Sequence, residues 1–262
     1  MKILILGNGW IGKILQKYLN ADMSVGDIEQ LHKTTIRKYD VVINTAAKTQ
    51  IDWCEKNKYE SLRVNALLSR RIAQICHDEN VKYVFFSSAC IFESKDSNDW
   101  KDETSYPNPG CFYSFTKAVA EWLILEVNPD ALIVRPRLPI SEVPHERNSL
   151  TKILKYPKLH DNQESITVVE DMLPVLKSLI EEDKKGIFHL VNEGTISPID
   201  MRGALALGGD YKLFKKEDEI KMMQADNRPR RVTTLVRNTK TTKLPDIQTR
   251  IHSIASMYKS LL

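Results

Sequence analysis

Near its amino end the chain reads Ile3-Leu4-Ile5-Leu6-Gly7-Asn8-Gly9-Trp10-Ile11-Gly12, a G-x-G-x-x-G motif placed directly after a strand-like apolar run and at the opening of a helix. In this context Gly7 permits the tight turn, Gly9 lets backbone N–H groups approach a pyrophosphate, and Gly12 lets the helix pack on the strand. The stretch therefore predicts a dinucleotide-binding turn. The structural alternative is the same turn without a ligand.

The alternation of strand and helix continues along the first half of the chain. Apolar strand-like runs occupy residues 1–6, 41–44, 82–87 and 131–135, with helix-like stretches at about 11–20, 58–78 and 113–127. Apolar strands separated by helices indicate a parallel sheet that is covered on both faces. We therefore predict an α/β protein with a Rossmann-type, doubly wound parallel sheet.

The pattern becomes less regular after about residue 138, with short apolar pieces at 166–169 and 186–191 between charged segments. We expect residues 1–138 to form the dinucleotide-binding domain. Residues 139–262 are expected to form a smaller substrate-binding lobe, interleaved with returns to the sheet.

Composition excludes several classes of protein. The 262 residues include 38 basic and 34 acidic side chains, and a net charge of +4 is too weak to indicate nucleic-acid binding. The apolar runs are far shorter than the ~18–20 residues of a membrane-spanning helix, and no secretory signal precedes the first strand, so we expect a cytoplasmic protein. The four cysteines show neither C-x-x-C pairs nor zinc-type spacing with histidines, so no metal is expected.

A second motif, Tyr113-Ser-Phe-Thr-Lys117, places a phenol and an ammonium one helical turn apart on the same helix face. A neighbouring ammonium favours phenolate and brings a tyrosine pKa from its ordinary ~10 toward neutrality, so that the phenol can exchange a proton with a substrate oxygen. Ser87 and Ser88, at the end of a predicted strand, complete the pattern. A purely structural helix face is the alternative.

Asp27 lies 20 residues after Gly7, which is the spacing of a carboxylate that binds the ribose 2′-hydroxyl of NAD. The strand that would carry it is weakly patterned. Asp27 is therefore either this ribose ligand or a solvated loop residue.

The chain resembles the extended short-chain dehydrogenase/reductases, and within them the nucleotide-rhamnose synthase/epimerase-reductase family, relatives of dTDP-4-dehydrorhamnose reductase. The resemblance is carried by Gly9-Trp-Ile-Gly12, Asn44-Thr-Ala-Ala47, Asp52-Trp-Cys-Glu55, Arg63-Val-Asn65, Cys90-Ile-Phe-Glu93, Phe112-Tyr-Ser114, Thr116-Lys117, Pro139-Ile-Ser141, Thr151-Lys152, Ser165-Ile-Thr-Val168 and Leu173-Pro174. The family's usual turn, G-x-x-G-x-x-G, is one residue longer than the Gly7-Asn-Gly9 turn of this chain.

The resemblance implies roles for particular residues. Ser88, Tyr113 and Lys117 match the reductase triad, in which the tyrosine gives a proton to the C4 oxygen, the serine binds that oxygen and the lysine holds the nicotinamide ribose. Cys90 and Lys152 match a pair implicated in epimerisation, and the order of acid and base between them stays open. Cys54, Cys76 and Cys111 are interpreted as ordinary core or loop residues.

Ligand-binding positions follow from the same resemblance. Asn148 and Arg230, the latter in the cluster Arg228-Pro-Arg230-Arg231, match positions that hold the nucleotide diphosphate, with a solvated basic surface as the alternative for the cluster. The cofactor, NADPH in preference to NADH, is expected at Gly7, Gly9, Trp10, Ile11, Gly12, Asn44, Ala46, Ala47, Thr49, Tyr113, Lys117 and Pro139.

The resemblance implies an enzyme that converts UDP-4-keto-6-deoxyglucose into UDP-L-rhamnose by 3,5-epimerisation followed by 4-reduction, and that forms a homodimer. The C4 ketone serves both steps, because it acidifies the hydrogens at C3 and C5 and then accepts a hydride. Two alternatives remain. One is a monofunctional 4-ketosugar reductase of the dTDP-4-dehydrorhamnose type, and the other is a non-catalytic, cofactor-binding regulatory subunit.

Overall fold

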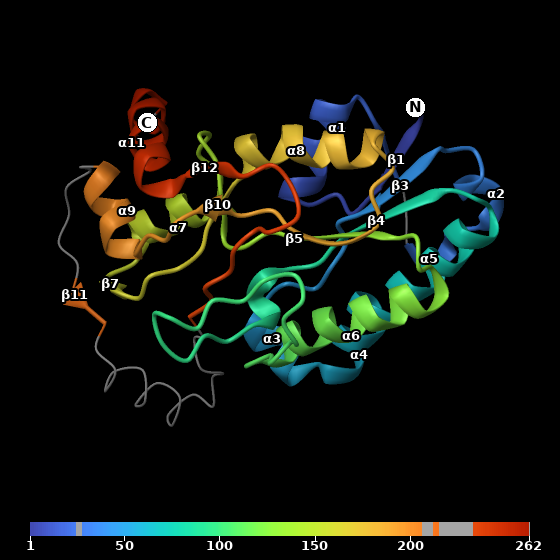
Figure 1. The fold of residues 1–262 in the computed structure, drawn as a ribbon, viewed down its shortest axis with the longest axis horizontal. Coiled ribbons are helices and arrows are strands. Elements are labelled where there is room, and N and C mark those ends of the chain that lie inside the picture. Colours follow the sequence, from blue (N-terminus) through green and yellow to red (C-terminus); the bar gives the residue numbers. More distant parts are fainter. Residues whose placement is uncertain (25–27, 206–211, 215–232, 262) are drawn as a thin grey trace. The chain divides into compact units, whose positions relative to one another are not determined.

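The computed structural model describes residues 1–24, 28–205, 212–214 and 233–261 (Figure 1). Asp27 and the cluster Arg228-Pro-Arg230-Arg231 lie outside the described residues. The chain divides into two compact units. Unit 1 comprises Met1–Ile91, Pro109–Arg135 and Leu176–Phe188, and unit 2 comprises Phe92–Asn108, Pro136–Val175 and His189–Leu262.

Unit 1 is built on a six-stranded sheet with the strand order β2-β1-β3-β4-β5-β9. Neighbouring strands from β2 to β5 pair in parallel, and the α/β fold class predicted from the sequence is confirmed. The strands are β1 (Ile3–Leu6), β2 (Asp22–Met23), β3 (Val41–Asn44), β4 (Lys82–Phe86), β5 (Leu132–Arg135) and β9 (Gly186–His189).

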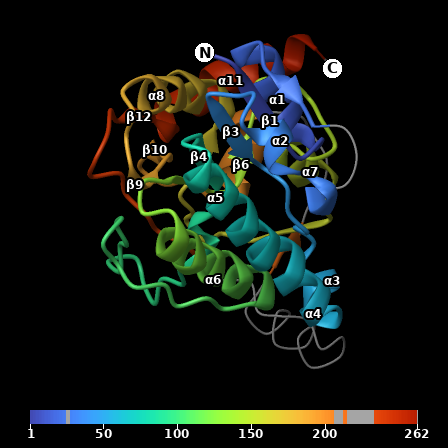
Figure 2. The same cartoon turned by 90° about the vertical axis from the view of Figure 1, so that its right-hand side faces the viewer.

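Helices cover both faces of this sheet, with α1 on one face and α5 and α6 on the other (Figures 1 and 2). One apolar cluster joins strand residues to the buried Ile72 of α5. The strand residues are Leu4, Val42, Phe85 and Ile133, and they alternate along the strands with residues of the opposite face. The helical elements are α1 (Trp10–Leu19), η1 (Ile28–Gln30), α2 (Lys33–Ile36), α3 (Ile51–Lys56), α4 (Lys58–Leu62), η2 (Arg63–Leu67), α5 (Leu68–Asp78), η3 (Ala89–Ile91), α6 (Phe112–Val127) and α8 (Val169–Glu181), whose first part belongs to unit 2.

The helix predicted over residues 58–78 is not continuous. Its α-helical parts α4 and α5 are joined by η2, one π-helical turn that contains the buried Asn65. A π turn inserts one residue into the regular helical repeat, and such turns are frequent at functional sites.

Unit 2 has its own apolar cluster, which includes Ile140, Leu150, Ile166, Ile251 and Tyr258. Its helix α9 contacts both α7 and α11. Three two-stranded parallel pairs, β6–β8, β7–β11 and β10–β12, complete the unit. The elements are β6 (Pro139–Ile140), α7 (Ser149–Lys155), β7 (Lys158–Leu159), β8 (Thr167–Val168), β10 (Asn192–Glu193), α9 (Pro198–Leu205), β11 (Lys212–Leu213), β12 (Leu244–Asp246) and α11 (Ile247–Ser260).

No helix among the described residues combines the length and the apolar character needed to cross a membrane. In the same part of the chain, no group of three or more His, Cys, Asp or Glu side chains is placed to hold a metal ion.

Candidate functional site

The turn between β1 and α1 depends on two of its three glycines for packing. Gly7 has a φ of +103°, and a Cβ atom there would lie 2.6 Å from the backbone nitrogen of Ala46. A Cβ atom at Gly12 would lie 2.0 Å from the carbonyl oxygen of Gly7. Both positions therefore exclude any side chain.

Gly9 differs from these two glycines because it faces open space. It is exposed, its φ of −84° suits any residue, and a Cβ atom there would meet nothing within 4 Å among the described residues. It is also the N-cap of α1, and neither a capping side chain nor an acidic residue of the described first turn engages this helix end. A backbone cradle with the positive end of a helix dipole fits the pyrophosphate of a dinucleotide.

The strand order places the loop after β3 beside this turn. Because β2 lies on one side of β1 and β3 on the other, the carboxyl ends of β1 and β3 form the switch point at which ligands bind in open parallel sheets. Thr45 joins the two loops, since its Oγ1 donates to the carbonyl oxygens of Leu6 at 2.9 Å and Gly7 at 3.2 Å.

The residues predicted to line the adenosine side of the cofactor differ in exposure. Ala46 and Ala47 are half-buried in this loop and Thr49 is exposed. The Asn44 side chain points into the core, where its Nδ2 donates to Tyr83 Oη at 2.9 Å and Ser69 Oγ at 3.2 Å. The role of Asn44 toward a cofactor stays a prediction, and its side-chain bonds are internal to unit 1.

The predicted triad lies wholly in unit 1. Tyr113 and Lys117 stand on consecutive turns of α6, and Ser88 follows the end of β4. Tyr113 and Ser88 are half-buried, and the Ser88 Oγ accepts a hydrogen bond from the Cys90 backbone nitrogen at 3.2 Å.

Lys117 is almost fully buried, with 1% of its surface exposed. Its Nζ donates to the Phe86 carbonyl oxygen at 2.6 Å and lies 4.0 Å from the centroid of the Phe85 ring. Burial lowers the pKa of this ammonium to about 8, against the opposing effects of Cys90 and Glu121. Lys117 is therefore an ammonium whose charge can change near neutral pH.

Cys90 is the half-buried cysteine of η3, two residues beyond Ser88. Cys54 and Cys76 are buried, and burial raises the pKa of each of these thiols. Cys111 is half-buried at the N-cap of α6, and its pKa is also raised by burial. The assignment of Cys90 to proton exchange stays a prediction.

Lys152, Asn148 and Pro139 belong to unit 2, so their roles toward the residues of unit 1 stay predictions. Burial, reinforced by Arg147 and opposed by Glu146, lowers the pKa of Lys152. Asn148 caps α7. Its Oδ1 accepts from the Leu150 backbone nitrogen at 3.0 Å, and its Nδ2 donates to the carbonyl oxygens of Ser141 and Val143.

Two polar residues of the site were not assigned a role from the sequence, although both lie in quoted motifs. Asn65 binds both backbone groups of Lys48, in the loop after β3, and its Nδ2 also donates to Thr116 Oγ1 at 3.0 Å. Glu55 of α3 accepts from the Phe112 backbone nitrogen at 2.7 Å and so caps α6. Asn65 therefore links α6 to the loop after β3, and Glu55 links α6 to α3.

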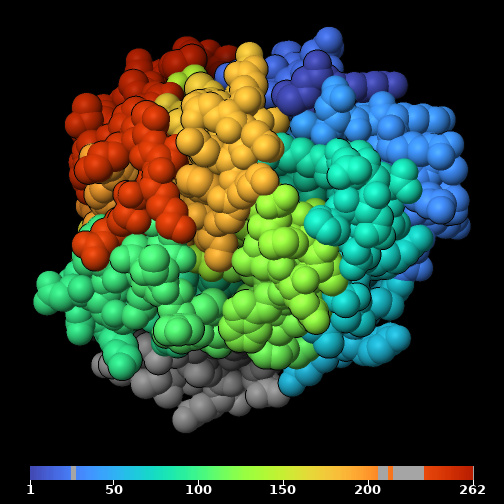
Figure 3. Space-filling view, turned by 45° about the vertical axis from the view of Figure 1, so that its right-hand side comes forward, coloured from blue at the N-terminus to red at the C-terminus, as the bar shows by residue number. Residues whose placement is uncertain are grey.

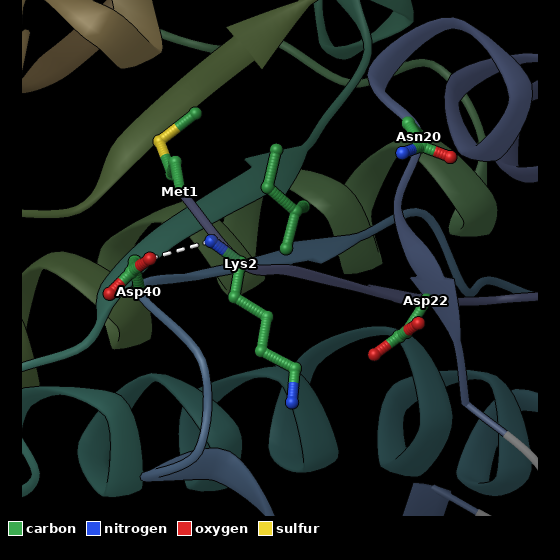
Figure 4. A pocket seen from close by; sticks show the side chains of 6 residues that line it. Met1, Lys2, Asn20, Asp22 and Asp40 are labelled. Carbon is green, nitrogen blue, oxygen red and sulfur yellow. Dashed lines mark hydrogen bonds between the residues drawn. The ribbon is translucent and has the colours of Figure 1, made fainter.

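A depression lies at the amino ends of the strands, opposite the end that carries the glycine turn (Figure 4). It is lined by Met1, Lys2, Ile3, Asn20, Asp22 and Asp40, which come from the amino ends of β1, β2 and β3 and from the end of α1. The Lys2 backbone nitrogen donates to Asp40 Oδ2 at 2.6 Å. Since ligands of such sheets bind beyond the carboxyl ends of the strands, we do not assign the active site to this depression.

A doubly wound parallel sheet, an open glycine turn at its switch point and a Tyr113–Lys117 helix define a short-chain dehydrogenase/reductase. The chain belongs to the family described as "RmlD substrate binding domain", which matches residues 1–256. The family membership predicted from the sequence is thereby confirmed.

Curated relatives occur in Arabidopsis thaliana. The chain is 32% identical over 75% of its length to the trifunctional UDP-glucose 4,6-dehydratase/UDP-4-keto-6-deoxy-D-glucose 3,5-epimerase/UDP-4-keto-L-rhamnose-reductase RHM1, and it spans 32% of that relative. It is 29% identical to the bifunctional dTDP-4-dehydrorhamnose 3,5-epimerase/dTDP-4-dehydrorhamnose reductase, over 85% of this chain and 81% of the relative. The chain thus spans only about a third of the trifunctional protein.

Solved structures share the fold. The crystal structure of the L780 UDP-rhamnose synthase from Acanthamoeba polyphaga mimivirus matches with a TM-score of 0.85 and 23% identity, covering 98% of this chain and 99% of that one. The dTDP-4-dehydrorhamnose reductase of Bacillus anthracis in complex with NADP matches with a TM-score of 0.80 and 19% identity, covering 97% and 98% of the two chains.

Proposed function

We propose that this protein reduces the C4 ketone of a nucleotide-linked 4-keto-6-deoxyhexose with NADPH. The observation that carries the proposal is the combination, within unit 1, of an open backbone cradle at Gly9 with the helix that presents Tyr113 and Lys117. The relatives named for rhamnose synthesis and reduction support the choice of substrate.

Each residue of the triad has a defined task in the proposed reaction. When bound, NADPH supplies the hydride that reduces C4. Tyr113 delivers its phenolic proton to the C4 oxygen, and Ser88 donates a hydrogen bond that holds this oxygen in place. Lys117, held by the Phe86 carbonyl, keeps a positive charge near the phenol and stabilises the phenolate that remains.

The preference for NADPH over NADH is supported by a structural neighbour that is solved with NADP. Comparison of kcat/KM for the two cofactors tests it, and a marked preference for NADH would contradict it. A cytoplasmic location stays a prediction from the sequence.

The finer proposal is that the same site first epimerises UDP-4-keto-6-deoxyglucose at C3 and C5. The half-buried Cys90, two residues past Ser88, favours it, because its thiol lies on the loop that holds the C4 oxygen in the proposed reaction. Lys152, whose pKa is lowered by burial, is the proposed partner in proton exchange. The bifunctional and trifunctional relatives support this step, and the reductase structure supports its absence equally.

Solvent deuterium separates the two candidates. A bifunctional enzyme that turns over UDP-4-keto-6-deoxyglucose in deuterated water gives L-rhamnose product labelled at C3 and C5. Cys90→Ser should lose this conversion, since a serine hydroxyl is a far weaker acid than a thiol, yet still reduce a 4-keto sugar supplied in the L-rhamno configuration. Wild-type product without deuterium, or reduction of only the L-rhamno substrate, would support the monofunctional reductase. The same assays are run with dTDP-linked and with UDP-linked substrates, so that the two nucleotides can be compared.

Nicotinamide absorbance provides the test of the proposed activity as a whole. Protein mixed with NADPH and either 4-keto sugar should consume the cofactor. No consumption with any of these substrates would leave the regulatory subunit as the remaining interpretation.

We also propose that the protein forms a homodimer through α4, η2 and α6. These elements contact one another and carry four exposed large apolar side chains, Tyr59, Leu67, Phe115 and Trp122. In Figure 3, α6 belongs to the light green surface and α4 and η2 to the cyan surface.

A further inference from the structure

Thr116 is a fully buried residue that the proposed reaction does not use. It lies on α6 between Tyr113 and Lys117, and none of its surface is exposed. The helix α6 packs along α5 (Figures 1 and 2) and contacts η2, the π turn that carries Asn65. Buried hydroxyl groups are normally hydrogen-bonded, and the partners of the Thr116 hydroxyl both lie in unit 1.

The Thr116 hydroxyl takes part in two hydrogen bonds of defined direction. Its Oγ1 donates to the Tyr113 carbonyl oxygen at 2.7 Å and accepts from Asn65 Nδ2 at 3.0 Å. A hydroxyl has one proton, and with that proton on the carbonyl only its lone pairs face Asn65. A threonine in a helix can direct its hydroxyl to a carbonyl of the preceding turn, and the Asn65 amide stabilises that orientation here.

The Asn65 amide uses all of its protons in the same arrangement. Its Oδ1 accepts from the Lys48 backbone nitrogen at 2.7 Å, and its Nδ2 donates to the Lys48 carbonyl oxygen at 3.1 Å as well as to Thr116. A flipped amide would set its oxygen against the Lys48 carbonyl oxygen. A chain of hydrogen bonds therefore runs from the loop after β3 through Asn65 and Thr116 to the backbone of Tyr113.

This chain joins the two parts of unit 1 at which the two halves of NADPH are proposed to bind. Ala46, Ala47 and Thr49 of the loop after β3 are the predicted contacts of the adenosine half. Tyr113 and Lys117 of α6 are predicted to lie at the nicotinamide half. One dinucleotide can contact both parts only if the separation between the loop and the helix is right.

We propose that Thr116 is a positioning residue, whose hydroxyl sets, through Asn65, the separation between the loop after β3 and the turn of α6 that carries Tyr113. The binding places of the two cofactor halves rest on the proposed function. Loss of the hydroxyl should therefore weaken binding of the whole dinucleotide and spare binding of its adenosine half.

The test compares the binding of NADPH with that of adenosine 2′,5′-bisphosphate, which lacks the nicotinamide half. Thr116→Val keeps the shape of the side chain, but a methyl group at the place of Oγ1 would lie 3.0 Å from Asn65 Nδ2. This is closer than the ~3.5–4.0 Å of an ordinary carbon contact, so the loop and the helix must move apart. By fluorescence and calorimetric titration we expect the Kd for NADPH to rise about tenfold and that for the bisphosphate to change less than about twofold.

Two further substitutions of Thr116 separate the hydroxyl from the rest of the side chain. Thr116→Ser keeps the hydroxyl and loses one methyl group, so it should restore the wild-type ratio of the two Kd values. Thr116→Ala is used if the valine variant does not fold. It lacks the hydroxyl without crowding Asn65, and it should raise the Kd for NADPH alone.

Asn128→Ala is the matched control for a general loss of stability. Asn128 is a buried residue at the other end of α6, and its Nδ2 donates to the Ala73 carbonyl oxygen of α5 at 3.1 Å. This variant should unfold at a lower temperature and leave both Kd values unchanged. A rise of both Kd values by the same factor in Thr116→Val, or of neither, would overturn the proposal and leave Thr116 as a packing residue.

Turnover separates the fate of this proposal from that of the proposed function. With saturating NADPH, Thr116→Val should lose about tenfold or more in kcat with little change in the KM for the sugar, because a displaced proton donor affects the reacting geometry. Thr116→Ser should recover the lost rate. A wild-type protein that reduces no 4-keto sugar, with a Thr116→Val variant impaired in binding NADPH alone, would contradict the proposed function and leave the role of Thr116 standing. An active enzyme whose Thr116→Val variant binds both probes and turns over like wild type would do the opposite.

Discussion

Tyr113 differs from phenylalanine by the one hydroxyl group that the proposed reaction requires. We expect Tyr113→Phe to lower kcat for reduction by about 10²–10⁴-fold, the usual contribution of a positioned proton donor. Binding of the sugar nucleotide, measured by calorimetry, should change little because the ring remains. Reduction at a near wild-type rate would remove Tyr113 from its role as donor.

Lys117 gives the stability of the protein a distinct dependence on pH. Its pKa of about 8 in the folded protein lies below the ordinary value of 10.5, so between these two values the unfolded chain binds a proton that the folded protein has lost. The contribution of Lys117 to the free energy of unfolding therefore rises as the pH rises through this window. In denaturant titrations, the free energy of unfolding of the wild type relative to that of Lys117→Met should therefore rise across this window, and curves that stay parallel would contradict the lowered pKa.

In the glycine turn, substitutions at two positions should affect cofactor binding and folding separately. Gly9→Ala should fold with wild-type stability, since its φ is ordinary and its Cβ atom enters open space, yet bind NADPH at least about tenfold more weakly because the methyl group occupies the approach to the backbone. Gly7→Ala is the matched control. It should lose more than about 2 kcal/mol of stability, because its φ is positive and its Cβ atom would clash with Ala46.

Thermal unfolding and fluorescence titration with NADPH measure these two effects separately. Equal loss of stability in both variants would mean that Gly9 is also a packing position. Unchanged NADPH binding by Gly9→Ala would place the pyrophosphate elsewhere.

The elements of the sheet could be predicted because their signals are local. The predicted strands at 41–44 and 131–135 agree with β3 and β5 to within one residue, since apolar runs bounded by turn residues read directly as buried strands. The same holds for the Tyr113–Lys117 helix. The π turn at η2 was not predicted, because nothing in helical periodicity marks where one residue is inserted.

The buried polar contacts were the part of the site that the sequence did not reveal. Glu121 pairs with Arg135, 14 residues later, and Glu55 caps a helix that begins 57 residues away. Asn148 was assigned to the substrate, and its side chain caps α7. These pairings depend on which strand and helix ends lie together in the fold. The sequence shows that a residue carries a charge or an amide, but it does not show the partner of that group. An acidic residue one turn after Lys117 in an apolar helix was the available signal for Glu121.

At the scale of the whole molecule, the exposed apolar side chains of α4, η2 and α6, the proposed dimer face, make the oligomeric state testable. Trp122 is 59% exposed, so Trp122→Lys should fold normally and weaken a dimer formed through this face. Sedimentation velocity of wild type and variant over a range of concentrations measures the change. Tyr106→Lys, at a 91% exposed position outside this face, is the control, and a wild-type protein that is monomeric at all concentrations would contradict the proposed dimer.

The interleaving of the two units has a consequence for how the protein is made. Unit 1 takes its last stretch from Leu176–Phe188, which contributes most of β9, so a growing chain cannot complete the sheet until residue 188 has left the ribosome. At a synthesis rate of ~5–20 residues per second, the backbone groups at the edge of β5 therefore stay unpaired for several seconds after β5 has emerged. Truncated nascent chains that end before β9 should therefore bind chaperones, and chains released after it should not.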